Sequence, residues 1–432
     1  MFTLLFIVLL LLGVAVRLWL ATRQTRYVVQ HRDQVPAEFA GRIGLHSHRR
    51  AADYTVARVR FDMFAIVFDA AVLVGLTLLG GIQALDQLAS RLVEHDFLRQ
   101  LVFLALVSGL IGLIGLPFTL WRQFRIEARF GFNRMTWRLF VSDALKGLLL
   151  SLALGLPLVA AILWLMGSAG PLWWLWGWAL WTVFNVVILL LFPTVIAPLF
   201  NKFTPLADET LAERIDRLAQ RCGFALNGLF VMDGSKRSAH GNAYFTGFGK
   251  GKRIVFFDTL LSRLTPEEIE AVLAHELGHF KHKHILKRLA FSFAMSLAFF
   301  ALLGWLSQQV WFYTGLGAEP SLIRSNDALA LVLFFLVAPV FTFVFTPLGT
   351  WYSRKHEFEA DHFATQNAEA SDLVSALVKL YDDNAATLTP DPVHSAFYDS
   401  HPPASIRINR LMAHAGATRT TATPPPSLPE SA

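Results

Sequence analysis

Leu172 to Leu199 read LWWLWGWALWTVFNVVILLLFPTVIAPL, and this run contains no charged side chain. A helix needs about 20 mostly apolar residues to cross the hydrocarbon core of a bilayer, so the run is long enough to span one. Lipid offers no hydrogen-bond partners to the backbone, and a single apolar segment satisfies its own amides there only as a helix. The stretch therefore predicts a transmembrane helix and, with it, the class of fold.

Other apolar runs meet the same length criterion, which gives about seven predicted spans in total. Of the 432 residues, 54% are hydrophobic and only 16% are charged, against about 25% charged in ordinary soluble domains. The single cysteine, Cys222, excludes a disulfide framework and a multi-cysteine metal site. The first span lacks a positively charged start, so we expect an uncleaved anchor. The further spans are predicted at Phe2–Leu20, Phe64–Leu85, Leu101–Leu120, Leu145–Met166, Leu289–Phe312 and Leu329–Thr350.

Basic residues alternate between the predicted loops. The first and third loops are rich in arginine, whereas the second, fourth and sixth are short and poor in lysine and arginine. The positive-inside rule places the basic loops in the cytoplasm, the amino terminus outside and the carboxyl terminus inside. The net charge of +6 is then interpreted as basic residues that face the cytoplasm and anionic lipid headgroups, and not as a nucleic-acid-binding surface. The basic stretch Lys281–Arg288 is interpreted as an interface anchor, and its His282 and His284 are left unassigned.

The predicted organisation has five parts. Two polar stretches, both on the cytoplasmic side, are long enough to fold, and the end of the chain is rich in Thr, Pro and Ser and is predicted to be disordered. The parts are a transmembrane region of about five spans (1–200), the first part of a cytoplasmic domain (201–285), two transmembrane helices (286–350), the second part of the domain (351–415) and the tail (416–432).

The first polar stretch contains the motif HELGH at 275–279, on a predicted helix that starts with a capping box at Thr265. His275 and His279 are four residues apart, so their imidazoles project from one face of the helix and can share one metal ion. Glu276 lies one step round the helix, where its carboxylate can reach a metal-bound water without being a ligand. This pattern predicts a zinc peptidase, and the alternative is an amphipathic helix with two surface histidines.

A catalytic zinc takes three protein ligands, so a third ligand must come from elsewhere in the chain. The segment after the last span, Ser353–Asp361, offers Glu357 with Asp361 one helical turn later. That spacing suits a carboxylate ligand and an acid that holds an imidazole N–H. Glu359 is the alternative ligand, although it points about 200° round the helix from Glu357. The remaining interpretation of these acids is solvated helix charge.

Several segments outside the metal motif resemble the CAAX prenyl protease 1 family of integral membrane zinc metallopeptidases. The resemblance covers most of the chain and implies a mainly α, polytopic fold. In this fold, helices enclose an intramembrane chamber, which a gluzincin-like α+β metalloprotease domain caps on the cytoplasmic side. The similar segments are the first cytoplasmic loop (Ala51–Ala57), the loop between the third and fourth spans (Glu127–Asn133), the segment ahead of the zinc helix (Ser235–Gly249, the strand Arg253–Phe257 and Asp258–Leu261) and the C-terminal signature (Ser400–Arg407).

The resemblance also implies roles for individual residues. One Zn²⁺ per chain is bound by His275, His279 and Glu357, with Glu276 as the general base. Asp361 orients one of the ligands. The remaining implied residues are His401 and Arg407, which stabilise the oxyanion, and the substrate-binding residues Asn242, Ala243 and Tyr244. We also expect the strand that ends at Phe257 to present a free edge to which an extended peptide adds.

The predicted function is an integral membrane zinc metalloendopeptidase that acts on a peptide or protein substrate. Eukaryotic members of the family cleave isoprenylated CAAX carboxyl termini. The short connection between Asn242 and the zinc helix, and the lack of a basic retrieval-like tail, favour a bacterial member in the inner membrane. One alternative is a quality-control protease of the related HtpX branch, for which fewer spans and no His-Pro-Pro signature are expected. The other alternative is a transporter or scaffold with an inert metal site. Such a protein is expected to lack one or more of the metal-binding residues.

Overall fold

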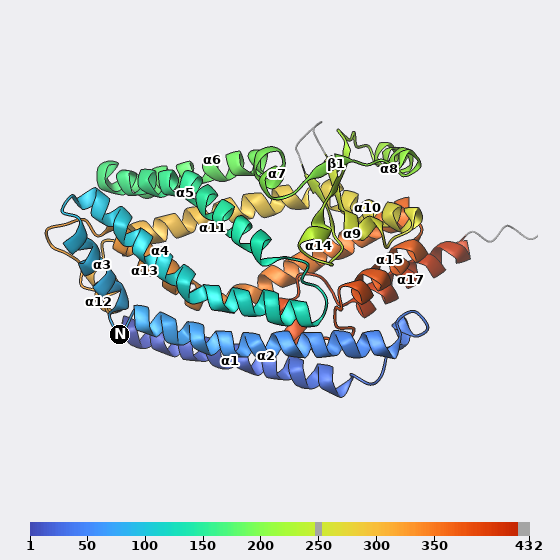
Figure 1. Cartoon of the computed structure of the whole chain (residues 1–432), viewed down its shortest axis with the longest axis horizontal. Coiled ribbons are helices and arrows are strands. Elements are labelled where there is room, and N and C mark those ends of the chain that lie inside the picture. Colours follow the sequence, from blue (N-terminus) through green and yellow to red (C-terminus); the bar gives the residue numbers. More distant parts are fainter. Residues whose placement is uncertain (247–252, 422–432) are drawn as a thin grey trace, which may run out of the picture.

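In a computed structural model, the chain forms long helices that run side by side, with a small sheet and a cluster of shorter helices at one end (Figure 1). The structure describes residues 1–246 and 253–421. The predicted mainly helical fold is confirmed. Within the described residues the helices are α1 (Phe2–Gln30), α2 (Leu45–Leu76), α3 (Gly81–Leu92), α4 (Asp96–Trp121), α5 (Trp137–Ser168), α6 (Trp173–Leu191), α7 (Ala197–Phe200), α8 (Glu209–Arg221), α9 (Asp258–Leu261), α10 (Pro266–Lys281), α11 (His284–Leu306), α12 (Val310–Thr314), α13 (Asp327–Thr342), α14 (Thr346–Asn367), α15 (Ala370–Asp383), α16 (Pro392–Tyr398) and α17 (Ala404–Thr421).

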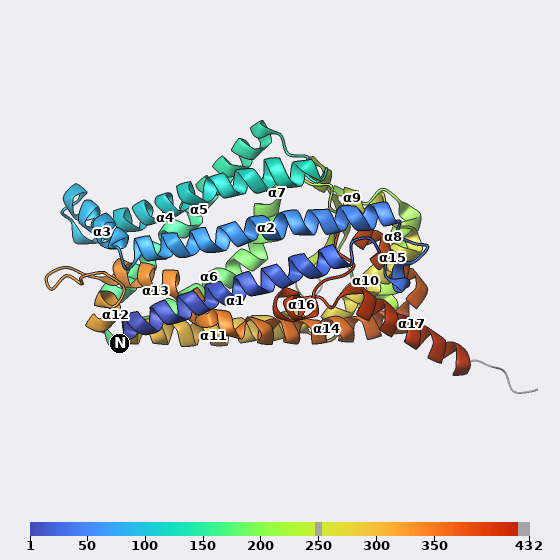
Figure 2. The ribbon, with the colours of Figure 1, turned by 90° about the horizontal axis from the view of Figure 1, so that it is seen from below.

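Within the described part of the chain, 6 helices are long and apolar enough to cross a membrane, or 7 if the bent pair α2 and α3 forms one span. This agrees with the predicted number of spans. These segments are Phe2–Gln30, Asp96–Glu127, Trp137–Ser168, Gly170–Phe200, His284–Leu306 and Asp327–Asn367. In Figure 2 they run lengthwise, and the amino terminus lies at the end of the bundle opposite α8, α10, α15 and α17.

The second predicted span, Phe64–Leu85, lies within the bent pair and is not one continuous helix. Helix α2 ends at Leu76, and the chain turns before α3 begins at an angle of 51°. Gly80 lies in this turn with a left-handed φ of 80°. Residues with a Cβ atom rarely adopt this conformation, whereas glycine adopts it readily. Because the apolar composition continues through the turn, hydropathy alone merged two helices into one span.

Two further sequence expectations need correction. Ala51–Ala57 forms part of helix α2 and not a loop, because neither proline nor glycine interrupts the chain between residues 45 and 74, and a polar segment can continue a helix beyond the membrane. At the other end, α17 continues to Thr421, so the predicted tail begins as helix. Residues 422–432 of that tail, and residues 247–249 of the family-like segment, lie outside the described residues.

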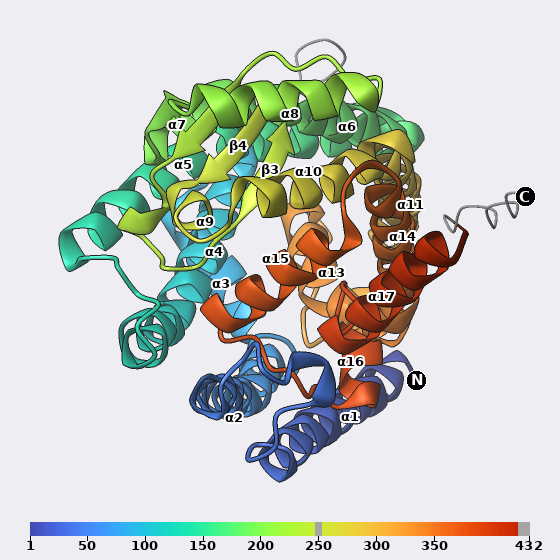
Figure 3. The same ribbon diagram turned by 90° about the vertical axis from the view of Figure 1, so that its right-hand side faces the viewer.

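The sheet consists of β1 (Phe203–Pro205), β2 (Leu229–Met232), β3 (Ala243–Thr246) and β4 (Arg253–Phe257), in the spatial order β1-β2-β4-β3. Strand β4 pairs with β2 in parallel and with β3 antiparallel. The predicted strand therefore has the expected bounds, but the expectation that it presents a free edge is wrong. Among the described strands, the edge next to β4 belongs to β3 (Figure 3).

A hydrophobic core joins the sheet to the shorter helices. Ile254 and Phe256 of β4 are fully buried, as is Leu218 of α8, and they belong to the same cluster as Leu273 of α10 and Val374 of α15. A separate cluster fills the membrane helices. Side chains from several helices line cavities, one of which has a volume of about 580 Å³ and includes Arg17 and Asp62 in its lining. The enclosed chamber implied by the resemblance stays a prediction.

Candidate metal centre

Helix α10 carries the HELGH motif and is anchored at its first turn. Thr265 accepts a hydrogen bond from the backbone N–H of Glu268, and the Glu268 carboxylate accepts one from the N–H of Thr265, as the sequence predicts. The same carboxylate accepts hydrogen bonds from Ser375 (2.7 Å) and Lys379 (2.8 Å) of α15. The start of the helix is therefore held both by its own cap and by a neighbouring helix.

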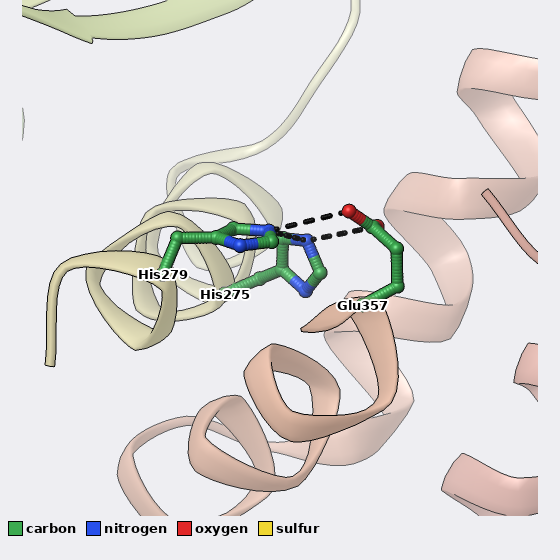
Figure 4. A group of neighbouring side chains, drawn as sticks. All are labelled: His275, His279 and Glu357. Carbon is green, nitrogen blue, oxygen red and sulfur yellow. Dashed lines mark hydrogen bonds and ion pairs between the residues drawn. The ribbon is translucent and has the colours of Figure 1, made fainter. Parts of the chain in front are cut away.

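Two histidines of α10 and a glutamate of α14 converge on one point (Figure 4). The Nε2 atoms of His275 and His279 lie 3.3 Å apart. Glu357 Oε2 lies 3.5 Å from His275 Nε2, and Glu357 Oε1 lies 3.4 Å from His279 Nε2. All three side chains are largely buried, with Glu357 only 3% exposed. The structure thus brings together the three residues that the sequence predicted as ligands.

The donor set suits a tetrahedral cation. Ligand atoms that each lie about 2.0–2.1 Å from one tetrahedral ion are separated from each other by roughly 3.3–3.4 Å, close to the spacings seen here. Glu357 Oε2 is buried and has no hydrogen-bond partner among the described residues. A buried carboxylate oxygen without a hydrogen bond is costly, and a cation bound directly to it would remove that cost. Two imidazoles and a carboxylate are also the ligand types that catalytic zinc takes.

Asp361 and Arg407 lie behind His275. The Nδ1–H of His275 donates to Asp361 Oδ1 at 2.8 Å, and Arg407 donates to both oxygens of Asp361, at 2.6 and 2.9 Å. Arg407 is 5% exposed, and its Nη1 lies 3.7 Å from Glu357 Oε2. Burial disfavours a charged His275, but hydrogen bonds to the Asp361 and Glu357 carboxylates outweigh it and raise the pKa of His275 to about 9. The site therefore favours positive charge.

The other predicted site residues lie around this group. His401 is largely exposed, and its Nε2 lies 3.5 Å from Glu357 Oε1. Glu276 follows His275 on α10 and is partly exposed. Asn242 precedes β3, and its backbone carbonyl accepts a hydrogen bond from the N–H of Phe257 at 3.0 Å. Ala243 and Tyr244, the remaining predicted substrate-binding residues, are the first two residues of the edge strand β3.

Sequence reasoning missed a second histidine cluster beside the first. His284 Nδ1 lies 2.9 Å from His279 Nδ1, and His284 Nε2 lies 2.9 Å from Glu359 Oε2. Glu359, considered above as the alternative metal ligand, thus contacts His284. His356 stacks on His284 with ring centroids 3.8 Å apart. The available signal was the spacing of His284 five residues after His279, but the surrounding lysines made the stretch resemble an interface anchor.

A metal-binding HExxH helix that faces a glutamate from a second helix, next to membrane-spanning helices, defines a membrane metallopeptidase. Comparisons with known proteins agree. Residues 24–202 match the family model described as CAAX prenyl protease N-terminal, five membrane helices, and residues 205–415 match peptidase family M48. The chain belongs to the CAAX prenyl protease 1 family.

Individual relatives match over most of their length. The chain is 41% identical to a CAAX prenyl protease 1 homolog of Arabidopsis thaliana over 324 residues, which cover 74% of each protein. It is 32% identical to the CAAX prenyl protease 1 homolog of Homo sapiens over 455 residues, covering 93% of this chain and 94% of the relative. The crystal structure of S. mikatae Ste24p matches with a TM-score of 0.87 and 29% identity, covering 95% of this chain and 99% of that one. These matches do not favour the HtpX alternative.

Proposed function

We propose that this membrane metallopeptidase is a zinc endopeptidase in which His275, His279 and Glu357 hold one Zn²⁺ per chain. The observation that carries the proposal is the convergence of three side chains whose donor atoms lie 3.3–3.5 Å apart, with one Glu357 oxygen that is buried and accepts no hydrogen bond from the described residues. When bound, zinc supplies Lewis acidity and makes water acidic enough to act as a nucleophile near neutral pH.

The protein side chains then carry out the proton transfers and stabilise charge. Glu276 accepts a proton from the attacking water and delivers it to the departing amine nitrogen. Asp361 keeps the proton of His275 on Nδ1, so that Nε2 is free to bind the metal. His401, exposed beside Glu357, donates a hydrogen bond to the oxyanion of the tetrahedral intermediate, and Arg407 contributes positive charge from behind Asp361.

The substrate is a peptide or protein, and we propose that β3 receives it as an added strand. β3 is an edge of the described sheet, and its first residues follow Asn242 directly. Main-chain hydrogen bonds to such an edge bind an extended peptide without regard to its sequence. We further propose that the substrate is lipidated at its carboxyl terminus and that membrane lipids surround the bundle. The relatives are named prenyl proteases, which supports a lipidated substrate.

We also propose that the protein lies in a bacterial inner membrane with the metal centre on the cytoplasmic side. The arginine-rich loops lie at the same end of the bundle as α10, and the positive-inside rule supports this orientation (Figure 2). Cysteines placed singly at exposed Glu209 and Leu322, in a Cys222→Ser background, test it in intact spheroplasts. A membrane-impermeant thiol reagent is expected to label only position 322, and labelling of only position 209 would reverse the orientation.

The activity is tested with the purified full chain and a matched pair of peptides, one prenylated and one not. We expect hydrolysis that stops when a chelator removes the metal and returns when zinc is added. Hydrolysis that is insensitive to chelation would contradict the metal proposal. Equal turnover of the two peptides would contradict only the proposal of a lipidated substrate.

A further inference from the structure

We propose that His284 and Glu359 form a positioning pair for the second metal ligand, with His284 holding His279 and Glu359 holding His284. The inference rests on the proposed metal centre and extends it. It assigns a role to a histidine in the basic stretch after the HELGH motif and to the acid that competes with Glu357 in the sequence.

The distances that link His279, His284 and Glu359 determine which nitrogen of each imidazole carries the proton. If Nε2 of His279 binds the metal, its proton sits on Nδ1, which lies 2.9 Å from His284 Nδ1. His284 must therefore accept at Nδ1 and carry its own proton on Nε2. That nitrogen lies 2.9 Å from Glu359 Oε2, which accepts. Each ring nitrogen thus has one consistent assignment, and the chain of hydrogen bonds fixes both the tautomer and the orientation of His279.

The local backbone and packing hold His284 in this place. Lys283 adopts a left-handed conformation with φ of 56°, so the chain changes direction between α10 and α11. His284 therefore begins α11 and is 1% exposed. The ring of His356 lies parallel to it, at an interplanar angle of 9°. A buried, stacked imidazole has little rotational freedom, which is what a positioning residue requires.

The two metal-binding histidines are supported in different ways. His275 donates directly to a carboxylate, Asp361, which a buried arginine neutralises. His279 instead faces the imidazole of His284. The carboxylate of Glu359 contacts the far side of that imidazole, and the Glu359 side chain is 32% exposed. Metal-binding histidines usually donate to a carboxylate, a carbonyl or water. The imidazole between His279 and Glu359 therefore separates the negative charge from the metal centre.

The same residues could instead hold a second metal ion, because donor atoms of His284, His356 and Glu359 lie within 4.8 Å of one another. Two observations argue against that alternative. Both nitrogens of His284 already have partners. In addition, imidazole binds metals in the plane of its ring, and two stacked parallel rings cannot direct their nitrogens at one point between them.

The test measures metal binding by the purified full chain, as zinc affinity in competition with a chelator and as the visible absorption of the Co²⁺-substituted protein. We expect His284→Ala to weaken zinc binding about 10–100-fold, the range for partners of metal-binding histidines, and to change the Co²⁺ spectrum. His284→Gln offers a hydrogen-bond acceptor to His279 and is expected to recover part of the affinity. His46→Ala, at an exposed histidine of α2, is the control and is expected to leave both readouts unchanged.

If His284→Ala does not fold, Glu359→Gln keeps the acceptor and removes its charge, and we expect it to shift the Co²⁺ spectrum with a smaller loss of affinity. Unchanged affinity and spectrum in the folded variants would overturn the positioning role. Two metal ions per wild-type chain, falling to one in His356→Phe, would overturn it in favour of a second site. Loss of metal in His275→Ala, alongside unaffected His284→Ala, would leave the proposed metal centre standing and remove only this pair.

Discussion

Gly278 of α10 and Ala360 of α14 approach so closely that a Cβ built on the glycine would lie 2.9 Å from the Cα of Ala360. The glycine lies between the two metal-binding histidines in the chain, and Ala360 lies one turn after Glu357. The close approach of these two helices is therefore the packing contact that brings the carboxylate to the imidazoles.

Gly278→Ala is expected to push α14 away from α10, because the added methyl group meets backbone atoms that cannot rotate aside. We expect a loss of stability of about 1–3 kcal/mol, the usual cost of overpacking, and weaker zinc binding. Thermal unfolding and chelator competition measure the two effects. Gly155→Ala on α5, where a Cβ meets nothing within 4 Å, is the control and is expected to be neutral or slightly stabilising. Normal zinc affinity in Gly278→Ala would contradict this packing account.

Glu268→Gln tests how the stability contributed by the capping-box residue Glu268 depends on pH. Burial favours the neutral acid, but hydrogen bonds from Lys379 and Ser375 outweigh it and lower the pKa of Glu268. The ionised form therefore stabilises the fold above its ordinary pKa, and this contribution is lost as pH falls through the lowered value. We expect the variant to unfold at a lower temperature than the wild type at pH 7, with the gap closing below about pH 4.

The control for that experiment is Glu267→Gln, a neighbouring acid whose side chain is 47% exposed in its pair with Arg214. Exposed ion pairs contribute little, so we expect a small change at either pH. A gap between wild type and Glu268→Gln that stays constant with pH would show that the charge of Glu268 does not stabilise the fold.

Asp361→Asn is expected to damage both metal binding and stability. Zinc affinity should fall about 10–100-fold, because His275 loses its anionic partner. Stability should fall by about 3–5 kcal/mol, because the buried guanidinium of Arg407 loses the carboxylate to which it is hydrogen-bonded. The double variant Asp361→Asn/Arg407→Gln separates the effects, since it should recover stability but not zinc affinity. Recovery of both would mean that Asp361 acts only on the fold.

Glu357→Ala and Glu359→Ala form a matched pair, two residues apart on one helix. We expect the first to lose zinc during purification and the second to retain it with reduced affinity, because only Glu357 directs its oxygens at both imidazoles. Elemental analysis of the purified chains gives the answer. Zinc retained by Glu357→Ala and lost by Glu359→Ala would exchange the roles of the two acids.

Local signals were sufficient to predict the metal helix. The capping box at Thr265 marked its start, and the spacing of His275 and His279 placed both rings on one face. The segment containing Glu357 and Asp361 could also be predicted, because their one-turn spacing is a property of a single helix. These features depend on residues that are close in the sequence, where helical periodicity gives direct information.

Features that depend on distant contacts were not predictable. The place of β4 inside the sheet follows from its pairing with Leu229–Met232 on one side and Ala243–Thr246 on the other, and no local pattern encodes that order. His284 lies among lysines, and its partner Glu359 follows 75 residues later. Its role depends on the packing of α14 against α10, which the sequence pattern does not specify.

The most direct test of the account measures zinc content and peptide hydrolysis on the same purified sample of Glu276→Gln. Glu276 follows His275 on α10. The proposal gives it a role in proton transfer and does not make it a metal ligand. We predict one zinc ion per chain, as in the wild type, and no detectable turnover. Substantial hydrolysis by the zinc-loaded variant would contradict the proposed chemistry at this centre.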